Sequence, residues 1–194
     1  RELARMIERA AIKFTKLPDE ECFDELVAQS TGAAPIFGAT GGVMEAALRT
    51  AANILDGTNE KIDFMDVRGT QGIKEATYRI AGAEVDVCVA SGLGNARDLI
   101  KAIKSGRAQY DFVEIMACPG GCAGGGGQPI CNDRDLSAER GARLYDLDAA
   151  NPVRFSHENT QVQKLYEEFL HEPCGHVSHH LLHTHYVDRS GEVK

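Results

Sequence analysis

Two cysteines in a glycine-rich segment are the residues of this sequence best suited to metal chemistry. Cys118 and Cys122 are separated by a proline and two glycines, and residues 119–127 contain six glycines. Thiolates are soft ligands that select iron–sulfur clusters, zinc or copper(I). Glycines let the backbone approach an inorganic group closely, and their N–H groups can hydrogen-bond to its anionic ligands. The segment therefore predicts a metal or cluster site.

The spacing of this cysteine pair distinguishes between the candidate metals. Cysteine-rich zinc sites commonly carry two Cys-x2-Cys pairs, and bacterial ferredoxins carry a Cys-x2-Cys-x2-Cys run. Here the pair is Cys-x3-Cys and occurs once. A tight loop with two incidental cysteines is disfavoured by the number of glycines around them. A zinc-binding structural module is retained as a distant alternative.

The other cysteines and the histidines do not provide a clear second pair of ligands. We expect Cys22 to be a surface or packing residue in an acidic stretch, and Cys88 to be a buried small apolar residue within a strand. Cys131 follows the glycines closely and could approach a metal, whereas Cys174 has no assigned role. The 176–185 segment contains two histidine pairs at i, i+4 spacing, and a metal site there is the less favoured interpretation.

Length and composition define the class of protein. The chain has 194 residues, of which 43% are apolar and 26% charged, enough for one α/β domain with a real core. A net charge of −8 argues against nucleic acid or an anionic membrane surface as the main partner. No apolar run reaches the length of a bilayer span. Six cysteines in a core-rich chain indicate reduced thiols and a cytoplasmic protein.

The apolar pattern predicts alternating helices and strands that would place the cysteines at a sheet edge. Helices are predicted over 1–14, 43–55, 96–104 and 158–171, and strands over 62–67, 76–81, 83–90 and 110–116. Asn95 is expected to cap the third helix, and 133–155 to be irregular. A strand–helix–strand order implies a parallel crossover, with the glycine-rich loop at the carboxyl end of a parallel strand. Because the chain opens inside a helix without Met, we expect the natural protein to continue upstream.

The cysteine segment resembles a known family motif. Residues 114–129 read Glu-Ile-Met-Ala-Cys-Pro-Gly-Gly-Cys-Ala-Gly-Gly-Gly-Gly-Gln-Pro and resemble the third cluster-binding motif of the FeFe (iron-only) hydrogenases. Four further stretches are similar to that family: 36–49, 67–76, 156–159 and 180–186. The resemblance covers nearly the whole chain, and it identifies the chain as the C-terminal part of the catalytic subunit, within the domain that holds the H-cluster.

The resemblance implies roles for five residues. Cys118 matches a ligand of a 4Fe–4S cube, and Cys122 matches the ligand that bridges the cube to a two-iron unit. Met116 matches a side chain packed near that unit, and Phe37 and Gly38 match residues that line its pocket. The implied site residues are therefore Cys118 and Cys122 as metal ligands, Cys122 and Met116 as catalytic residues, and Phe37, Gly38, Met116, Cys118 and Cys122 as cofactor-binding residues.

The resemblance also implies an architecture. Residues 1–132 would form the C-terminal lobe of the H-cluster domain, and 133–194 a small-subunit-like extension packed on it. The expected fold is α/β, one lobe of the catalytic domain, with a mainly parallel sheet flanked by helices and a helical C-terminal tail.

The implied activity is the reversible oxidation of dihydrogen to protons and electrons. The family's other two cube ligands, its relay cysteine and its pocket lysine are not in this sequence, so the H-cluster would be incomplete here and the isolated chain inactive. The implied partners are the upstream lobe of the same polypeptide and electron carriers that are ferredoxin-like or NAD(P)-linked. A hydrogenase-like iron–sulfur assembly factor and a hydrogenase-related sensor remain alternatives.

Overall fold

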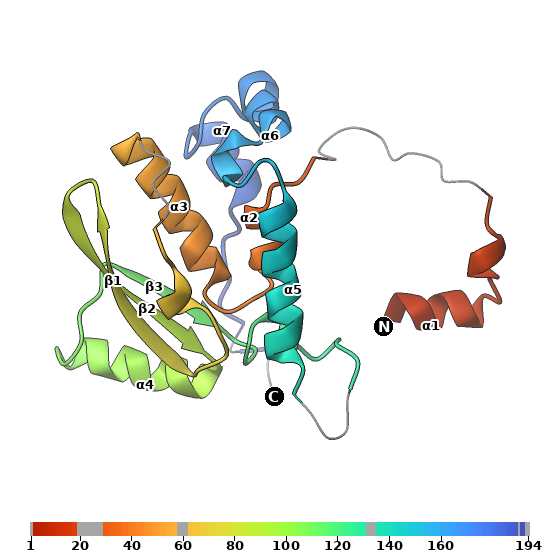
Figure 1. The fold of residues 1–194 in the computed structure, drawn as a ribbon, viewed down its shortest axis with the longest axis horizontal. Coiled ribbons are helices and arrows are strands. Elements are labelled where there is room, and N and C mark those ends of the chain that lie inside the picture. Colours follow the sequence, from red (N-terminus) through yellow and green to blue (C-terminus); the bar gives the residue numbers. More distant parts are fainter. Residues whose placement is uncertain (1, 19–28, 58–61, 131–134, 190, 193–194) are drawn as a thin grey trace.

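A computed structural model describes residues 2–18, 29–57, 62–130, 135–189 and 191–192 (Figure 1). Its centre is a three-stranded sheet in the order β1 (Ile73–Ile80), β2 (Ala83–Ser91) and β3 (Phe112–Met116). Helix α3 (Gly42–Asp56) covers one face and α4 (Leu93–Lys104) the other, so the core has three layers. The prediction of an α/β fold is confirmed.

The sheet is half parallel and half antiparallel. β2 and β3 pair in parallel, which confirms the predicted crossover through α4. β1 and β2 form an antiparallel hairpin whose turn residues, Ala81 and Gly82, have positive φ angles of 51° and 78°. Right-handed strand twist favours such a turn between adjacent strands. The expectation of a mainly parallel sheet is therefore only partly met.

The segment predicted as a strand over 62–67 does not join the sheet. Met65–Val67 instead forms a short 3-10 helix, η2. The apolar residues of this segment are buried: Phe64 lies against Tyr78 with ring centroids 5.0 Å apart, and Val67 is fully buried beneath α3. The apolar residues of this segment therefore resembled the pattern of a strand in the sequence. In the structure, the Phe64 and Val67 side chains instead fill the space between α3 and β1.

The two faces of the sheet bury different kinds of side chain. Under α3 the core contains Met44, Leu48, Val87 and Val89, which are large and aliphatic. Under α4 it is thinner and includes Cys88, which is buried as the sequence predicted. Burial also raises the pKa of the Cys88 thiol, in keeping with a packing role.

Helix α4 begins three residues earlier than predicted. Gly92, with a φ of 89°, precedes its first residue, Leu93. Asn95 lies inside the first turn and does not act as a cap; its side-chain amide donates to the Ser91 carbonyl at 2.6 Å. The helix ends at Lys104 as predicted, and Gly106 adopts a φ of 71° just beyond it.

The remaining helices lie at the two ends of the chain. These elements are α1 (Glu2–Arg9), η1 (Phe14–Lys16), α2 (Ala33–Ile36), α5 (Ser137–Ala150), η4 (Ser156–Glu158), α6 (Thr160–Leu165), the π-helical turn η5 (Tyr166–Leu170) and α7 (His176–Leu182). α1 is shorter than predicted, buries no residue and lies apart from the other helices (Figure 1). The helix predicted over 158–171 begins at Thr160, where the Asn159 side chain accepts the N–H groups of Gln161 and Val162.

The prediction that 133–155 is irregular is wrong, because α5 occupies most of that range. Its buried positions are Ser137, Gly141 and Asp148, which are small or polar and give no apolar period. α5 packs on α2 and on the short η3 helix (Cys122–Gly124) (Figure 1). Residues 131–134 lie outside the described part of the chain.

Buried charges join α5 to α3. Asp148 of α5 accepts two hydrogen bonds from Arg49 of α3, at 2.9 and 2.7 Å, and two from Arg154, at 3.0 and 2.5 Å. Glu45, fully buried, pairs with Arg49 and with Arg68. Burial raises the pKa of Asp148, but the bonds from the two arginines outweigh it, and the net pKa is lowered.

We predict that Asp148→Asn destabilises the protein by about 3 kcal/mol, because it removes half of a buried pair and leaves buried guanidinium charge uncompensated. Urea unfolding followed by circular dichroism measures the change. The control is Asp146→Asn, two residues away on the same helix, whose ion pair with Arg143 is exposed and should contribute little.

The stability that the Asp148 ion pairs contribute depends on pH. A carboxyl whose folded pKa lies below its ordinary value of 3.8 contributes stability above that pH and loses it as the pH falls through the folded pKa. The stability gap between the native protein and Asp148→Asn should therefore be constant near neutrality and narrow below about pH 3.8. A gap that stays constant down to pH 2 would contradict this assignment.

Candidate metal centre

The cysteine loop, residues 118–127, follows the carboxyl end of β3. Cys118 comes two residues after Met116, the last residue of the strand. Gly120 and Gly121 then adopt left-handed φ angles of 79° and 81°, and the Gly121 N–H donates to the Cys118 carbonyl at 2.9 Å. This turn lies between Cys118 and Cys122. Both thiols are free and exposed.

The turn over residues 37–42 meets the cysteine loop, in keeping with the placement of Phe37 and Gly38 that the family resemblance implies. The Ala123 N–H donates to the Gly38 carbonyl at 2.9 Å. A Cβ at Gly121 would lie 2.7 Å from the Gly38 oxygen and 2.9 Å from the Thr40 nitrogen, so only glycine permits this approach. The two loops are thus in direct backbone contact. Phe37 remains 45% exposed beside them, and Met116 is half-buried.

Glu114 holds the first of these loops from within the sheet. Its two carboxylate oxygens accept the N–H groups of Gly41 and Met44, each at 2.7 Å, at the start of α3. A carboxylate is favourable there because the first N–H groups of a helix have no partner within it. Glu114 is buried and lies four residues before Cys118 on the same segment of chain. One strand therefore positions both loops.

Three polar side chains complete the support beneath the loops. Ser91, at the end of β2, accepts the Gly120 N–H at 3.0 Å, and its hydroxyl lies 3.4 Å from that of Thr40. Lys74 is buried on β1 and donates to the Gly69 carbonyl at 2.7 Å. Burial lowers the pKa of Lys74 to about 8, against the opposing attraction of Glu114. Sequence reasoning did not predict a role for these residues. The signal in the sequence was Lys74 itself, a charged residue on the face of the 73–80 strand that is otherwise apolar.

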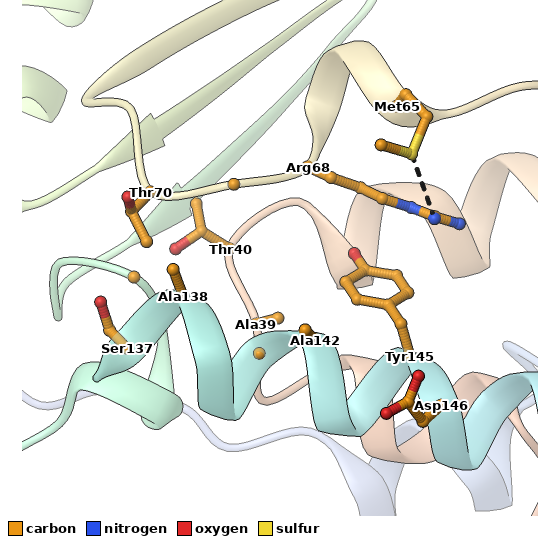
Figure 2. A pocket seen from close by; sticks show the side chains of 13 residues that line it. Ala39, Thr40, Met65, Arg68, Thr70, Ser137, Ala138, Ala142, Tyr145 and Asp146 are labelled. Carbon is orange, nitrogen blue, oxygen red and sulfur yellow. Dashed lines mark hydrogen bonds between the residues drawn. The ribbon is translucent and has the colours of Figure 1, made fainter. Parts of the chain in front are cut away.

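A cavity of about 340 Å³ opens where the two loops meet α5 (Figure 2). Its walls are mainly small residues, including Ala39 and Thr40 of the turn, Gly120 of the cysteine loop, and Ala138 and Ala142 of α5. None of the five predicted site residues lines it. Sequence reasoning therefore located the loops correctly and missed the contribution of α5.

One end of this cavity is polar. The guanidinium of Arg68 lies over the ring of Tyr145, 4.1 Å from its centroid, and also donates to the Met65 sulfur at 3.4 Å (Figure 2). The Tyr145 hydroxyl is buried without a hydrogen-bond partner among the described residues, and burial raises its pKa. A cation over an aromatic face is an attractive contact that fixes both side chains.

The described residues contain no group of three or more His, Cys, Asp or Glu side chains arranged to hold a metal ion. In the histidine-rich tail, the rings of His179 and His183 stack with centroids 4.5 Å apart, without a third ligand. Cys174 is exposed at a left-handed φ of 60°. The predictions for Cys22 and Cys131 fall outside the described residues. No described helix is long and apolar enough to cross a bilayer.

The donor set fits half of an iron–sulfur site. Cys118 and Cys122 are accessible thiols four residues apart, and the glycines of their loop would let backbone N–H groups approach a bound cluster. This arrangement suits an iron–sulfur cluster whose remaining ligands are thiolates from elsewhere. Structural zinc also takes four protein ligands, so these two thiols alone do not complete a zinc site either.

Comparisons with known proteins point to one family. The family model described as "Iron only hydrogenase large subunit, C-terminal domain" matches residues 1–126, and "Iron hydrogenase small subunit" matches 134–189. The chain is 52% identical to the NADP-reducing hydrogenase subunit HndD of Solidesulfovibrio fructosivorans over 97% of its own length and 32% of the relative's. It is 44% identical to iron hydrogenase 1 of Clostridium pasteurianum, over 96% and 33% of the two chains.

More distant relatives belong to another class. The cytosolic iron-sulfur assembly component 3 of Rattus norvegicus is 32% identical over 77% of this chain and 31% of that protein.

Among solved structures, a variant of FeFe hydrogenase HydA1 from Chlamydomonas reinhardtii matches with a TM-score of 0.74 and 40% identity. That match covers 96% of this chain and 54% of the other. The chain spans about a third of the length of the curated relatives named here.

The fold and the cysteine loop together place the chain in an iron–sulfur protein class. The chain belongs to the iron-only hydrogenase large-subunit family, of which it carries the C-terminal domain followed by a small-subunit segment.

We predict that Gly121→Ala separates the two loops. A side chain at a φ of 81° is strained by about 1–3 kcal/mol, and its Cβ would also press on the Gly38 and Thr40 backbone. Urea unfolding should show that loss, and maleimide labelling of Cys122 should accelerate. The matched control is Gly126→Ala, where nothing lies within 4 Å of the added carbon and φ is not positive. Identical behaviour of the two variants would disprove the contact.

Proposed function

We propose that the protein to which these residues belong is an iron-only hydrogenase that catalyses the reversible oxidation of dihydrogen to protons and electrons. The supporting observation is the pair of free thiols, Cys118 and Cys122, on a loop that is hydrogen-bonded to the 37–42 turn. The chain is 52% and 44% identical to two relatives named hydrogenases but 32% identical to the assembly component. This difference in identity also favours a hydrogenase.

The proposed cofactor is the H-cluster, a 4Fe–4S cube linked to a two-iron unit, and the five predicted residues would surround it. Cys118 would ligate the cube and Cys122 would bridge it to the two-iron unit. Met116, Phe37 and Gly38 would line the pocket of that unit. When bound, the cluster supplies the heterolytic cleavage of dihydrogen, while the protein supplies ligation, orientation and exclusion of water.

The chain on its own offers half of such a site. Its two thiols would leave the cube without two of its ligands, and exposed apolar residues beside the loops, including Phe37 and Ile130, remain uncovered. We propose that an upstream lobe of the same polypeptide covers this face and provides the missing ligands. Residues 1–132 would then be the C-terminal lobe, and 133–194 a small-subunit-like extension packed on it.

Electron carriers would complete the reaction. A relative named an NADP-reducing hydrogenase subunit supports NAD(P)-linked or ferredoxin-like domains or subunits as the partners that accept electrons. We propose a cytoplasmic location on the basis of the reduced thiols, although one relative is named a periplasmic large subunit. Dihydrogen and protons would be the only substrates exchanged at the cluster.

The second candidate is an iron–sulfur assembly factor or a hydrogenase-related sensor. The relatives named assembly components support the first of these. A protein of either kind would bind iron and sulfide at the cysteine loop without sustained hydrogen turnover. Measuring both iron content and hydrogen evolution on the same sample separates them from a hydrogenase.

We predict that the whole protein evolves hydrogen after anaerobic reconstitution with iron, sulfide and the two-iron precursor, whereas the 194-residue chain does not. The reason is that metal affinity depends on a complete ligand set in a formed cavity. Hydrogen evolution with a reduced dye measures turnover.

Cys122→Ser should abolish turnover in the whole protein, because the bridging thiolate is lost. The control is Cys174→Ser, which removes an exposed cysteine in the tail and should leave turnover unchanged. Sustained turnover by the isolated chain, lost on Cys122→Ser, would show that the chain is self-sufficient and that the half-site proposal is wrong.

A further inference from the structure

The cysteine loop is bridged by one side chain from the C-terminal extension. Arg140 of α5 donates from Nη1 to the Ala123 carbonyl at 3.3 Å and from Nη2 to the Pro129 carbonyl at 2.7 Å. These two acceptors lie on either side of the glycine run 124–127. The planar guanidinium therefore ties together the two ends of the all-glycine part of the loop.

Within the loop, the Gly125 N–H donates to the Cys122 carbonyl at 3.0 Å and the Gln128 N–H donates to the Gly125 carbonyl at 3.1 Å. Nothing lies within 4 Å of an ideal Cβ at Gly126 or Gly127, so their backbone is loosely packed. Glycine also loses more conformational freedom on ordering than any other residue. The Gln128 side chain also joins the loop to itself, donating from Nε2 to the Cys122 carbonyl at 3.1 Å. Arg140 adds a restraint on this run from outside the loop.

The restraint acts on the residue next to Cys122. Ala123 is buried; its N–H donates to the Gly38 carbonyl, and its own carbonyl accepts from Arg140. Ala123 is therefore held from the 37–42 turn on one side and from α5 on the other. Fixing the backbone on both sides of this residue also fixes the direction from which Cys122 presents its thiol.

The start of α5 packs against the same loop. A Cβ at Gly120 would lie 2.9 Å from the Ser137 Cβ, and one at Gly124 would lie 3.1 Å from it. Ser137 itself is buried. The Arg140 contacts are therefore part of a continuous packed surface between the loop and the first turn of the helix.

We propose that Arg140 is a positioning residue for the cluster: it holds the 123–129 backbone so that Cys122 keeps a fixed orientation. Through it, the extension matched by the small-subunit model controls the geometry of a ligand that lies in the large-subunit domain. This inference rests on the proposed function. Residues that orient a metal ligand without touching the metal commonly affect affinity by about 10–100-fold.

The test compares Arg140→Gln, Arg140→Lys and Arg143→Gln in the whole, cluster-loaded protein. Arg143 is the matched control: it lies on the same helix, its side chain is 82% exposed, and its hydrogen bond is to Asp146. We expect Arg140→Gln to lose iron to a ferrous chelator about tenfold faster than the native protein and to shift the electron paramagnetic resonance spectrum of the cube. Arg140→Lys, which keeps the charge but cannot span two carbonyls, should be intermediate. Arg143→Gln should match the native protein.

A second measurement keeps the test independent of cluster loading. In cluster-free whole protein, mass spectrometry should find Cys122 labelled by maleimide faster in Arg140→Gln than in Arg143→Gln. Equal labelling and equal iron loss in the two variants would overturn the positioning role. Failure of the native protein to bind a cube would instead count against the proposed function, and the labelling comparison would still decide the inference. If Arg140→Gln does not fold, the same comparisons are made with Arg140→Lys.

Discussion

The carboxylate of Glu114 is the contact on which the arrangement of the site depends. It lies on β3, the strand that leads into the cysteine loop, and it binds two N–H groups at the start of α3, where the 37–42 turn ends. The strand and the turn are far apart in sequence, and this one buried side chain sets their separation. Its two hydrogen bonds are those of a buried carboxylate to backbone N–H groups, a charge-assisted and therefore strong kind of bond.

A second set of buried charges attaches the extension. Asp148 of α5 pairs with Arg49 of α3 and with Arg154, and Glu45 pairs with Arg49 and Arg68. Buried ion pairs of this kind contribute less to stability than to a unique geometry, because a displaced partner leaves an uncompensated charge. The register between α5 and α3 is consequently well defined. That register in turn places Arg140 and Ser137 against the cysteine loop.

Sequence reasoning predicted what local patterns encode. The helix over 43–55, the strands around Cys88 and Ile115, and the parallel crossover were correct because apolar periods and glycine boundaries determine them. It failed at α5, whose buried positions are small or charged, and at 62–67, whose buried aromatic fills a gap without joining the sheet. The meeting of the two loops followed from a family resemblance. The roles of Glu114, Lys74 and Arg140 depend on long-range contacts that no local pattern contains, and the functions of Cys118 and Cys122 stay predictions.

The attachment of α5 has a consequence for how such a protein can be encoded. The relative named a periplasmic large subunit aligns with 131 residues, 67% of this chain. All the contacts of α5 described above are non-covalent, so they would serve equally well between two polypeptides. When both parts are on one polypeptide, the peptide link raises the effective concentration of the extension at its docking site. For a short connection this concentration is on the order of millimolar. Completion of the cysteine loop then no longer depends on how much of a second gene product the cell makes, whereas a split version would dissociate on dilution.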